Sequence, residues 1–388
     1  METLHRPIIG DSRSMEGLPD NSIDLVITSP PYPMIEMWDP IFSSFQPKIT
    51  TLLEKGDGPR AFEAMHKILD PVWKECYRVL KPGRFACINI GDATRTLKEQ
   101  FSLYTNHARI LAVTQKIGFS SLPCILWRKQ TNAPNKFMGS GMLPAGAYVT
   151  LEHEYILILR KGPKREFNKE ADKQSRRESA LFWEERNVWF SDVWFDIKGA
   201  VQSMGDKTAR KRSGAYPFEL AHRLINMYSV QGDQVLDPFL GTGTTMAAAM
   251  AANRNSVGYE LDASLGPGIS AMAETVNVTA AQVIRQRLIR HIDFVLERMK
   301  TRGPLKHSNR HYGFPVITAQ ERGLLFKTPM TVTQTLNHHY KVTYDPLPQK
   351  EFCKDWSKIL ASKEAGQLVA AIEKAVTPKK RVVQGELF

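Results

Sequence analysis

Residues 235–245 read Val235-Leu236-Asp237-Pro238-Phe239-Leu240-Gly241-Thr242-Gly243-Thr244-Thr245. An apolar strand ends here in an acid, a Gly-x-Gly turn follows, and a run of small residues begins a helix. Glycines at such a turn let the backbone bend tightly into the helix and approach a ligand closely. The stretch therefore predicts a strand–turn–helix unit of a nucleotide-binding α/β sheet.

A second acid supports a ligand at this turn. Glu260 ends the next predicted strand, Val257-Gly258-Tyr259-Glu260. An acid in this position of a nucleotide-binding sheet commonly accepts hydrogen bonds from ribose hydroxyls. A Walker A loop is excluded because no Gly-Lys-Ser/Thr follows, and the GxGxxG fingerprint fails because Met246 replaces its third glycine. A tight turn without a ligand is the alternative.

The other informative stretch is Ser29-Pro30-Pro31-Tyr32, which follows the apolar run 23–28. Ligands of open α/β sheets bind at the carboxyl ends of the strands. Two prolines fix φ and remove two backbone donors, so carbonyl groups are left to face a ligand. Tyr32 adds a flat ring, and the stretch is a plausible seat for a planar base with an amino group. A rigid strand-end turn with ordinary packing of Tyr32 is the alternative.

The rest of the chain alternates strand and helix patterns, which predicts an α/β fold with a parallel-rich sheet. Helical periodicity covers 60–80, 107–117, 217–228 and 244–252, and strand patterns cover 8–11, 23–28, 85–90, 122–127, 154–159, 234–236 and 256–259. Lys81-Pro82-Gly83 is expected to end the helix at 60–80. A long basic helix and a mixed region are expected beyond residue 280.

Composition describes a soluble globular chain with a basic balance. The 388 residues are 42% hydrophobic and 24% charged, with a net charge of +12. Such an excess of positive charge favours a polyanionic partner, most simply nucleic acid. The four cysteines are widely spaced, so neither a metal site nor a disulfide framework is predicted. We expect no membrane segment and a cytoplasmic location.

Taken together, residues 28–32 and 237–245 resemble the two signature motifs of the amino-type DNA methyltransferases. That family transfers a methyl group from S-adenosylmethionine (AdoMet) to N4 of cytosine or N6 of adenine. The motif order resembles the circularly permuted beta group of restriction-modification methyltransferases. The resemblance implies a Rossmann-like AdoMet-dependent methyltransferase fold, circularly permuted, with an inserted target-recognition region. It covers roughly residues 5–162 and 213–265.

The resemblance also assigns residues. Tyr32 would stack on a base flipped out of the duplex, and Ser29 Oγ and the Pro30 carbonyl would accept hydrogen bonds from its amine. Methyl transfer would then be direct, through positioning and electrostatics. The catalytic candidates are Ser29, Pro30, Pro31 and Tyr32. The cofactor-binding candidates are Asp11, Pro217, Asp237, Phe239, Gly241, Gly243, Thr244, Thr245 and Glu260.

Ser29 directs the choice of base. In this family Ser-Pro-Pro-Tyr is more usual among cytosine-N4 enzymes, and Asp-Pro-Pro-Tyr among adenine-N6 enzymes. We therefore expect a cytosine-N4 enzyme, with adenine-N6 methylation as the first alternative and a non-catalytic DNA-binding protein with a vestigial AdoMet fold as the second. Methylation at C5 of cytosine is disfavoured, because only Cys124 follows a proline and the rest of that motif is missing.

We expect four regions: a catalytic half at 1–162, a basic and aromatic target-recognition insertion at 163–214, an AdoMet-binding half at 215–280, and a C-terminal extension at 281–388. Recognition is expected from about 130–215, whose basic residues suit phosphates. The aromatic cluster at 182–195 is interpreted as a small core. The predicted partners are double-stranded DNA and a cognate restriction endonuclease. The terminal Gln384-Gly385-Glu386-Leu387-Phe388 resembles a motif that docks bacterial proteins on the replication sliding clamp, with a chance match of five residues as the favoured alternative. Association with the prokaryotic nucleoid follows from these partners.

Overall fold

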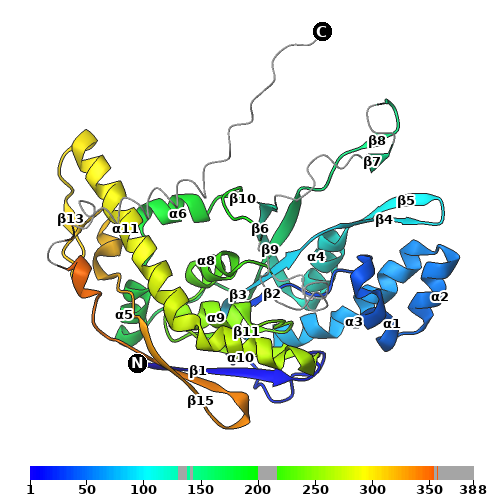
Figure 1. Ribbon diagram of the computed structural model, residues 1–388, viewed down its shortest axis with the longest axis horizontal. Coiled ribbons are helices and arrows are strands. Elements are labelled where there is room, and N and C mark those ends of the chain that lie inside the picture. Colours follow the sequence, from blue (N-terminus) through cyan, green and yellow to red (C-terminus); the bar gives the residue numbers. More distant parts are fainter. Residues whose placement is uncertain (130–137, 140–142, 200–215, 354–355, 357–388) are drawn as a thin grey trace.

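The computed structural model of the protein describes residues 1–129, 138–139, 143–199, 216–353 and 356, and a ten-stranded sheet forms its centre (Figure 1). The strand order is β10-β6-β9-β3-β2-β11-β12-β1-β16-β15. The bounds are β1 (Glu2–Ile9), β2 (Ile23–Thr28), β3 (Leu80–Ile90), β6 (Phe119–Arg128), β9 (His153–Lys161), β10 (Val193–Trp194), β11 (Gln234–Asp237), β12 (Asn255–Glu260), β15 (Pro329–Gln334) and β16 (Tyr340–Tyr344).

Five neighbouring strands of this sheet are parallel, in the order β3, β2, β11, β12 and β1. The chain builds β2 and β3 early and β11 and β12 late, yet β2 pairs directly with β11. On the two sides of this parallel block, β9 and β16 run antiparallel to their neighbours. The two sequence halves therefore form one continuous sheet, as expected for the permuted α/β fold.

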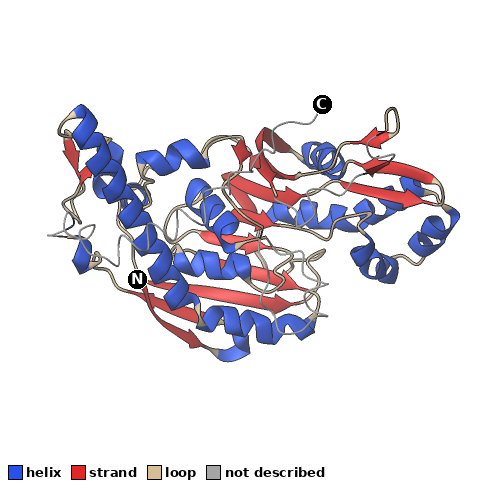
Figure 2. Ribbon diagram, turned by 45° about the horizontal axis from the view of Figure 1, so that its top comes forward, coloured by secondary structure: helices blue, strands red, loops and turns tan. Residues whose placement is uncertain are grey.

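Helices cover both faces of the sheet (Figure 2). All six residues of β2 are buried, with Val26 facing the core under α3 (Gly58–Val79) and Leu25 and Ile27 facing the core under α8 (Phe218–Tyr228). The other helices are α1 (Asp39–Phe45), α2 (Lys48–Lys55), α4 (Asn106–Ile117), α5 (Glu170–Glu178), α6 (Trp183–Trp189), α9 (Thr244–Ala251), α10 (Gly266–Glu274) and α11 (Val276–Arg302), with short 3-10 turns η1 (Glu36–Trp38), η2 (Ala263–Leu265), η3 (Ala319–Gly323), η4 (Leu336–His338) and η5 (Lys350–Phe352). Burial on both faces explains the apolar run Leu25-Val26-Ile27 in β2.

Among the described residues, three antiparallel strand pairs lie outside the main sheet. They are β4 (Ala93–Leu97) with β5 (Gln100–Tyr104), β7 (Met138–Gly139) with β8 (Ala147–Tyr148), and β13 (His307–Ser308) with β14 (Pro315–Val316). The first follows directly after β3 and projects beyond the sheet (Figure 1).

The helix α3 ends at Val79, just before Lys81-Pro82-Gly83, as the sequence predicts. The strand β3 begins earlier than the predicted start at residue 85, so Lys81-Pro82-Gly83 belongs to the strand. Gly83 has φ of +78°, and a Cβ atom there would lie 2.7 Å from the backbone nitrogen of Arg165. A glycine is therefore required where the chain after β9 crosses this bend.

The expected insertion and the expected C-terminal extension share one hydrophobic core. Phe182, which lies just before α6, is fully buried with Leu288 and Ile292 of α11 and with Phe314. The guanidinium group of Arg287 on α11 donates hydrogen bonds of 2.6 and 2.8 Å to Glu185 on α6. Neither α11 nor any other helix of the described residues combines the length and apolar character needed to cross a membrane.

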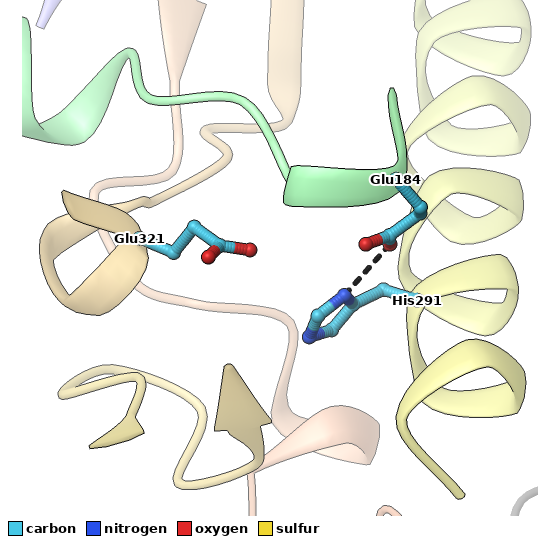
Figure 3. A group of neighbouring side chains, drawn as sticks. All are labelled: Glu184, His291 and Glu321. Carbon is cyan, nitrogen blue, oxygen red and sulfur yellow. Dashed lines mark hydrogen bonds and ion pairs between the residues drawn. The ribbon is translucent and has the colours of Figure 1, made fainter. Parts of the chain in front are cut away.

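A buried polar group strengthens this shared core (Figure 3). His291 Nε2 lies 3.0 Å from the carbonyl of Pro315, and Nδ1 lies 2.8 Å from Glu184 Oε1. Since a carbonyl only accepts, Nε2 is the donor to Pro315. Burial raises the pKa of Glu184, and the hydrogen bond with His291 acts in the opposite direction. Glu321 accepts bonds from the backbone nitrogens of Trp183 and Thr318, so the three side chains join α6, α11 and η3.

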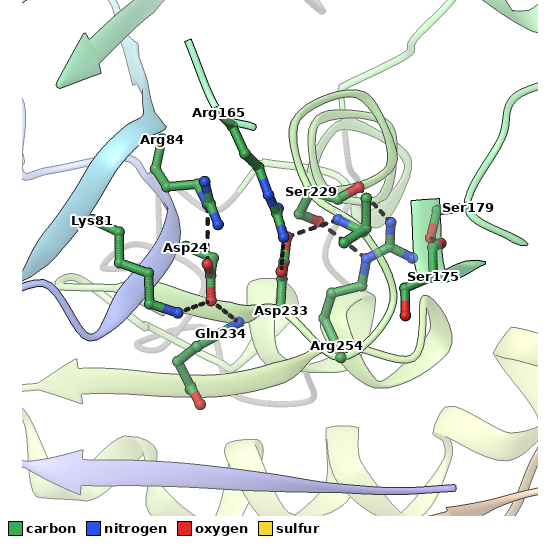
Figure 4. A network of polar contacts seen from close by, with 12 residues as sticks. Asp24, Lys81, Arg84, Arg165, Ser175, Ser179, Ser229, Asp233, Gln234 and Arg254 are labelled. Atoms are coloured by element: carbon green, nitrogen blue, oxygen red, sulfur yellow. Dashed lines mark hydrogen bonds and ion pairs between the residues drawn. The ribbon is translucent and has the colours of Figure 1, made fainter. Parts of the chain in front are cut away.

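A second polar network joins the halves at the amino ends of the central strands (Figure 4). The carboxylate of Asp24, at the start of β2, is almost fully buried. Its three donors are Lys81 Nζ at 2.7 Å, Arg84 Nε at 3.0 Å and the backbone nitrogen of Gln234 at 3.1 Å. Beside it, Arg165 forms a salt bridge of 2.6 Å with Asp233. This edge of the sheet is thus closed by ion pairs, opposite to the edge where the predicted site residues lie.

Candidate active site

The carboxyl ends of four parallel strands bring the predicted site residues to one edge of the sheet. The register pairs Leu236 with Val26, Asp237 with Gly258, and Glu260 with Ile9. Ser29 therefore follows β2 beside Asp237, and Asp11 follows β1 beside Glu260. Loops at this edge of open α/β sheets form ligand sites, which makes it the candidate active site.

Asp237 connects the two predicted motifs. Its Oδ1 accepts hydrogen bonds from Thr28 Oγ1 at 2.7 Å and from the backbone nitrogen of Phe239 at 3.0 Å. Its Oδ2 accepts bonds from the hydroxyls of Tyr216 and Thr245. Burial raises the pKa of this carboxyl, while these donors act in the opposite direction. Asp237 was predicted to contact the cofactor, and in the structure protein groups bind both of its oxygens.

The glycine turn has the geometry that its sequence suggested. Gly241 and Gly243 have φ of +56° and +90°, a region that other residues rarely adopt. A Cβ atom on Gly241 would meet nothing within 4 Å, so the outer side of the turn is open. Gly243 caps α9, whose first residues are the half-buried Thr244 and the buried Thr245. A ligand can therefore approach the backbone of this turn closely.

Glu260 is oriented by backbone groups of two loops. Its Oε2 accepts a 2.8 Å bond from Gly241 nitrogen, and Oε1 accepts a 2.8 Å bond from Asp262 nitrogen. Burial raises the pKa of Glu260, and the two backbone bonds act against this rise. Each carboxylate oxygen has a further lone pair, which is what two ribose hydroxyls would require.

Asp11 lies next to Glu260 in space, because the backbone nitrogen of Gly10 donates a 2.8 Å bond to the carbonyl of Glu260. Burial opposes ionisation of Asp11, but hydrogen bonds and charge from Arg13 hold its pKa below the usual range. An ionised, half-exposed acid, a second acid and an open glycine turn together fit a charged nucleoside such as AdoMet.

The loop after β2 carries the four catalytic candidates. Pro30 is buried, while Ser29, Pro31 and Tyr32 are half-buried. Ser29 Oγ donates a 3.0 Å hydrogen bond to Tyr32 Oη, so the serine and the tyrosine of the motif contact each other directly. Two residues later Met34 has φ of +69°, an uncommon conformation for a side chain of this size. The Ser29–Tyr32 bond and the turn at Met34 thus define the shape of the loop at the position expected for the base.

Two residues outside the sequence-predicted site contact Tyr32 Oη, and a third contacts one of these two. Tyr32 Oη donates to Glu154 Oε2 at 2.9 Å, and Asn89 Nδ2 donates to both of these oxygens at 2.9 and 2.7 Å. Lys129 Nζ lies 3.0 Å from Glu154 Oε1. The sequence positions of two of them, Asn89 and Glu154, could have indicated a role in the site. Asn89 is a polar residue inside an otherwise apolar strand, and Glu154 stands at the start of β9.

The remaining cofactor candidates line the same edge. Pro217 precedes α8, and the neighbouring Tyr216, which the sequence reasoning left out of the site, bonds to Thr245 and Asp237. Phe239 packs against the ring of Trp73 on α3, with the ring centroids 6.2 Å apart. Pro217 and Phe239 thus border the site from opposite faces of the sheet.

The expected recognition region is described only in part. Within the aromatic cluster, Phe182, Trp189 and Trp194 are buried, whereas Phe190 and Phe195 are exposed. The guanidinium group of Arg128, at the end of β6, lies 6.0 Å from the ring of Phe195. The basic group Lys207, Arg210, Lys211 and Arg212 and the terminal Gln384–Phe388 motif lie outside the described residues.

Comparison with known proteins identifies relatives over most of the chain. A family described as DNA methylase, with the label N6/N4 methyltransferase, matches residues 23–266. The Type II methyltransferase M.MthZI of Methanothermobacter thermautotrophicus is 49% identical, and the match covers 90% of this chain and 98% of the relative. M.MjaI of Methanocaldococcus jannaschii, also a Type II methyltransferase, is 48% identical over 68% of this chain and 89% of its own length.

Two solved structures are also similar to this chain. The Thermus thermophilus protein TTHA0409, described as a DNA modification methylase and solved with S-adenosyl-L-methionine, is 31% identical with a TM-score of 0.55. The alignment covers 70% of this chain and 94% of that protein. The cytosine-N4-specific PvuII DNA methyltransferase has a TM-score of 0.50 at 15% identity, covering 72% and 93%, and shares the fold.

Proposed function

The chain belongs to the N6/N4 family of DNA methylases, which use AdoMet, and we propose that it methylates the N4 amine of cytosine in double-stranded DNA. The observation that carries the choice of base is Ser29. A serine, not an aspartate, opens the catalytic motif, and Ser-Pro-Pro-Tyr is the form more usual among cytosine-N4 enzymes. The match to methyltransferases over nearly the full chain disfavours the non-catalytic alternative.

The proposed chemistry follows from the loop after β2. The target amine is engaged in base pairing, so the base has to leave the duplex before it can react. Tyr32 would stack on the flipped base. Ser29 Oγ already donates its proton to Tyr32, so its lone pairs are available to accept a hydrogen bond from the amine. Together with the Pro30 carbonyl, this would direct the nitrogen lone pair toward the methyl donor.

The cofactor residues would act on the other side of the same edge. Glu260 would accept bonds from the ribose hydroxyls of AdoMet, and Asp11 would lie near its adenine. Asp237 would act indirectly, since its oxygens hold Thr28, Tyr216 and Thr245 in place. Bound AdoMet supplies an electrophilic methyl group, and the protein positions the amine against it.

Nucleoside analysis tests this proposal. Unmodified plasmid DNA is incubated with the purified chain and AdoMet, digested to nucleosides and analysed by mass spectrometry. We expect N4-methylcytosine, and its loss in a Ser29→Ala variant that still binds AdoMet. N6-methyladenine as the sole product would replace cytosine with adenine as the target and support the alternative.

The Type II methyltransferases among its relatives place the chain with restriction-modification enzymes. We therefore propose a cognate restriction endonuclease that cleaves the same DNA sequence when it is unmethylated. Docking of Gln384–Phe388 on a sliding clamp and association with the nucleoid stay predictions. A pull-down with clamp protein tests the first, because deletion of residues 384–388 should abolish capture.

A further inference from the structure

The phenol oxygen of Tyr32 has a full set of hydrogen bonds. It accepts from Ser29 Oγ at 3.0 Å and from Asn89 Nδ2 at 2.9 Å, and it donates to Glu154 Oε2 at 2.9 Å. A phenol has one proton and two lone pairs. Because both lone pairs are occupied, the Tyr32 proton points at Glu154 and the Ser29 proton points at Tyr32.

Asn89 fixes this direction. Its amide nitrogen donates to Tyr32 Oη and, at 2.7 Å, to Glu154 Oε2. A flipped amide would place its oxygen against the Glu154 carboxylate, so the reverse orientation is unfavourable. Asn89 Oδ1 is buried and has no hydrogen-bond partner among the described residues. The amide is therefore held by its two donor bonds alone, and both end on the Ser29–Tyr32–Glu154 chain.

Glu154 terminates this chain of hydroxyls as a carboxylate. Its Oε1 forms a 3.0 Å ion pair with Lys129, which leaves Oε2 to Tyr32 and Asn89. The side chain of Glu154 is only 12% exposed, whereas that of Lys129 is 44% exposed. Lys129 therefore pairs with the buried carboxylate from the solvent side, and Glu154 is the last group of the chain that can accept a proton.

We propose that Ser29, Tyr32 and Glu154 form a proton relay, with Glu154 as the final acceptor of the proton that the methylated amine must lose. This inference rests on the proposed amino-methyltransferase function but is independent of which base is the target. The amine lone pair forms the new N–C bond while the C–S bond of AdoMet breaks and sulfur keeps the electron pair. The amine then gives its N–H proton to Ser29 Oγ, Ser29 gives its own to Tyr32 Oη, and Tyr32 gives its own to Glu154 Oε2.

The environment of Tyr32 suits a relay in which each hydroxyl accepts one proton as it donates another. Burial, followed by the charge of Glu154, raises the pKa of Tyr32 well above its ordinary value. The phenol is therefore neutral before and after the transfer, and no tyrosinate has to form. Methylation also turns the target nitrogen into a strong acid, so the transfer toward a carboxylate is downhill.

The test is single-turnover methylation of unmodified plasmid DNA at saturating AdoMet, measured across pH with wild type and Glu154→Gln. Glutamine keeps the shape and can still accept from Tyr32, but it cannot take up a proton. We expect the transfer rate to fall about a hundredfold or more, as for loss of a general base. AdoMet affinity should be unchanged. The matched control is Glu152→Gln, because Glu152 is an exposed acid beside β9 that pairs with Arg128.

The pH profile separates a relay from a purely structural role. The wild-type rate should fall on acidification, as protonated Glu154 can no longer accept, whereas the Glu154→Gln rate should be independent of pH over the same range. Other ionisable groups near Glu154 are Lys129, Tyr32, His153, Tyr155, and the His107–Asp92 pair that stacks on Tyr155. If Glu154 causes the fall in rate on acidification, a His107→Gln variant should show the same fall as wild type.

Two results would overturn the relay. One is a slow Glu154→Gln variant whose transfer rate still falls on acidification as in wild type, which would mean that Glu154 only orients Tyr32. The other is a Tyr32→Phe variant, which keeps the ring but breaks the relay, that transfers methyl groups at the wild-type rate. Adenine as the methylated base would refute the cytosine assignment and leave these criteria for the relay as they stand.

Discussion

Thr28 and Asp237 are joined by a 2.7 Å hydrogen bond, although 209 residues separate them in the chain. Thr28 is the last residue of β2 and immediately precedes the catalytic loop, while Asp237 ends β11 and begins the glycine turn. The bond therefore fixes the position of the methyl-accepting loop relative to the loop expected to hold the methyl donor. In-line transfer depends on that relative position, because small displacements of reacting groups are costly in rate.

Thr28→Val tests this connection. Valine keeps the shape but removes the donor, so buried Asp237 loses one of the two partners of Oδ1. We expect the free energy of unfolding to fall by about 1–3 kcal/mol and the methyl-transfer rate to fall as well. Chemical denaturation and single-turnover kinetics measure the two effects.

The control for Thr28→Val is Thr114→Val. Thr114 is equally buried, but its hydroxyl bonds to the carbonyl of Ile110 within α4, away from the site. This variant should lose some stability and keep its transfer rate. Equal rate losses in both variants would contradict the special role of the Thr28–Asp237 bond.

Gly91 provides the space in which Tyr32 lies. A Cβ atom on Gly91 would be 3.0 Å from a ring carbon of Tyr32 and 3.4 Å from Cγ of Glu154. Gly91→Ala should therefore displace the ring, weaken its bonds to Ser29 and Glu154, and lower the methyl-transfer rate at least tenfold, the cost of about 1.4 kcal/mol. Gly17→Ala, where a Cβ atom meets nothing within 4 Å, should leave the rate unchanged. Normal kinetics in Gly91→Ala would show that the ring can move without consequence.

The sheet and its carboxyl edge could be predicted because the decisive residues are local in sequence. The apolar run 23–28 and the acid–glycine turn at 237–243 carry their structure in their own patterns, and parallel strands bring both to one edge. The hairpin β4–β5 was not predicted because the half-buried residues of these strands show no clear alternation. The same limit applied to β15, whereas β16 alternates buried Tyr340, Val342 and Tyr344 with more exposed residues, yet its region was predicted only as mixed.

The parts of the site that escaped prediction depend on distant side chains. Glu154 reaches Tyr32 from a strand 122 residues later, and Tyr216 reaches Asp237 from the segment before α8. No spacing in the sequence encodes such contacts, because they depend on which strands become neighbours. The core shared by Phe182 and α11 is another example, since its two parts lie in separate regions of the predicted organisation.

Asp24 offers a stability test away from the site. Its carboxylate is 4% exposed and receives bonds from Lys81, Arg84 and the backbone of Gln234. Asp24→Asn removes the negative charge and leaves Arg84 and Lys81 without it, so we expect a loss of about 3–5 kcal/mol in the free energy of unfolding. The AdoMet affinity of the folded fraction should be unchanged, because this network lies at the opposite edge of the sheet. Weakened AdoMet binding, measured by calorimetry on fully folded protein, would argue against this separation.

Glu260 predicts a pH dependence whose sign can be stated. Because burial raises its pKa in the folded protein, the folded chain binds more protons than the unfolded chain between the ordinary and the raised pKa. The contribution of Glu260 to the free energy of unfolding therefore falls as pH rises through that window. Glu260→Gln removes this contribution, so its stability relative to wild type should increase with pH in the same window.

AdoMet binding should show the opposite trend, which makes the two measurements a joint test of Glu260. The ionised carboxylate accepts bonds from ribose hydroxyls better than the protonated form, so wild-type affinity should fall on acidification through the raised pKa. Asp11 stays ionised over this range because Arg13 lowers its pKa, so Asp11 does not contribute to the pH dependence of AdoMet affinity there. Glu260→Gln should bind AdoMet more weakly at neutral pH, by roughly tenfold for the loss of one charged hydrogen bond, with little pH dependence. Isothermal titration calorimetry from neutral pH down to the ordinary glutamate pKa near 4.5 is the measurement. A wild-type affinity that does not fall on acidification would contradict the assigned role of Glu260.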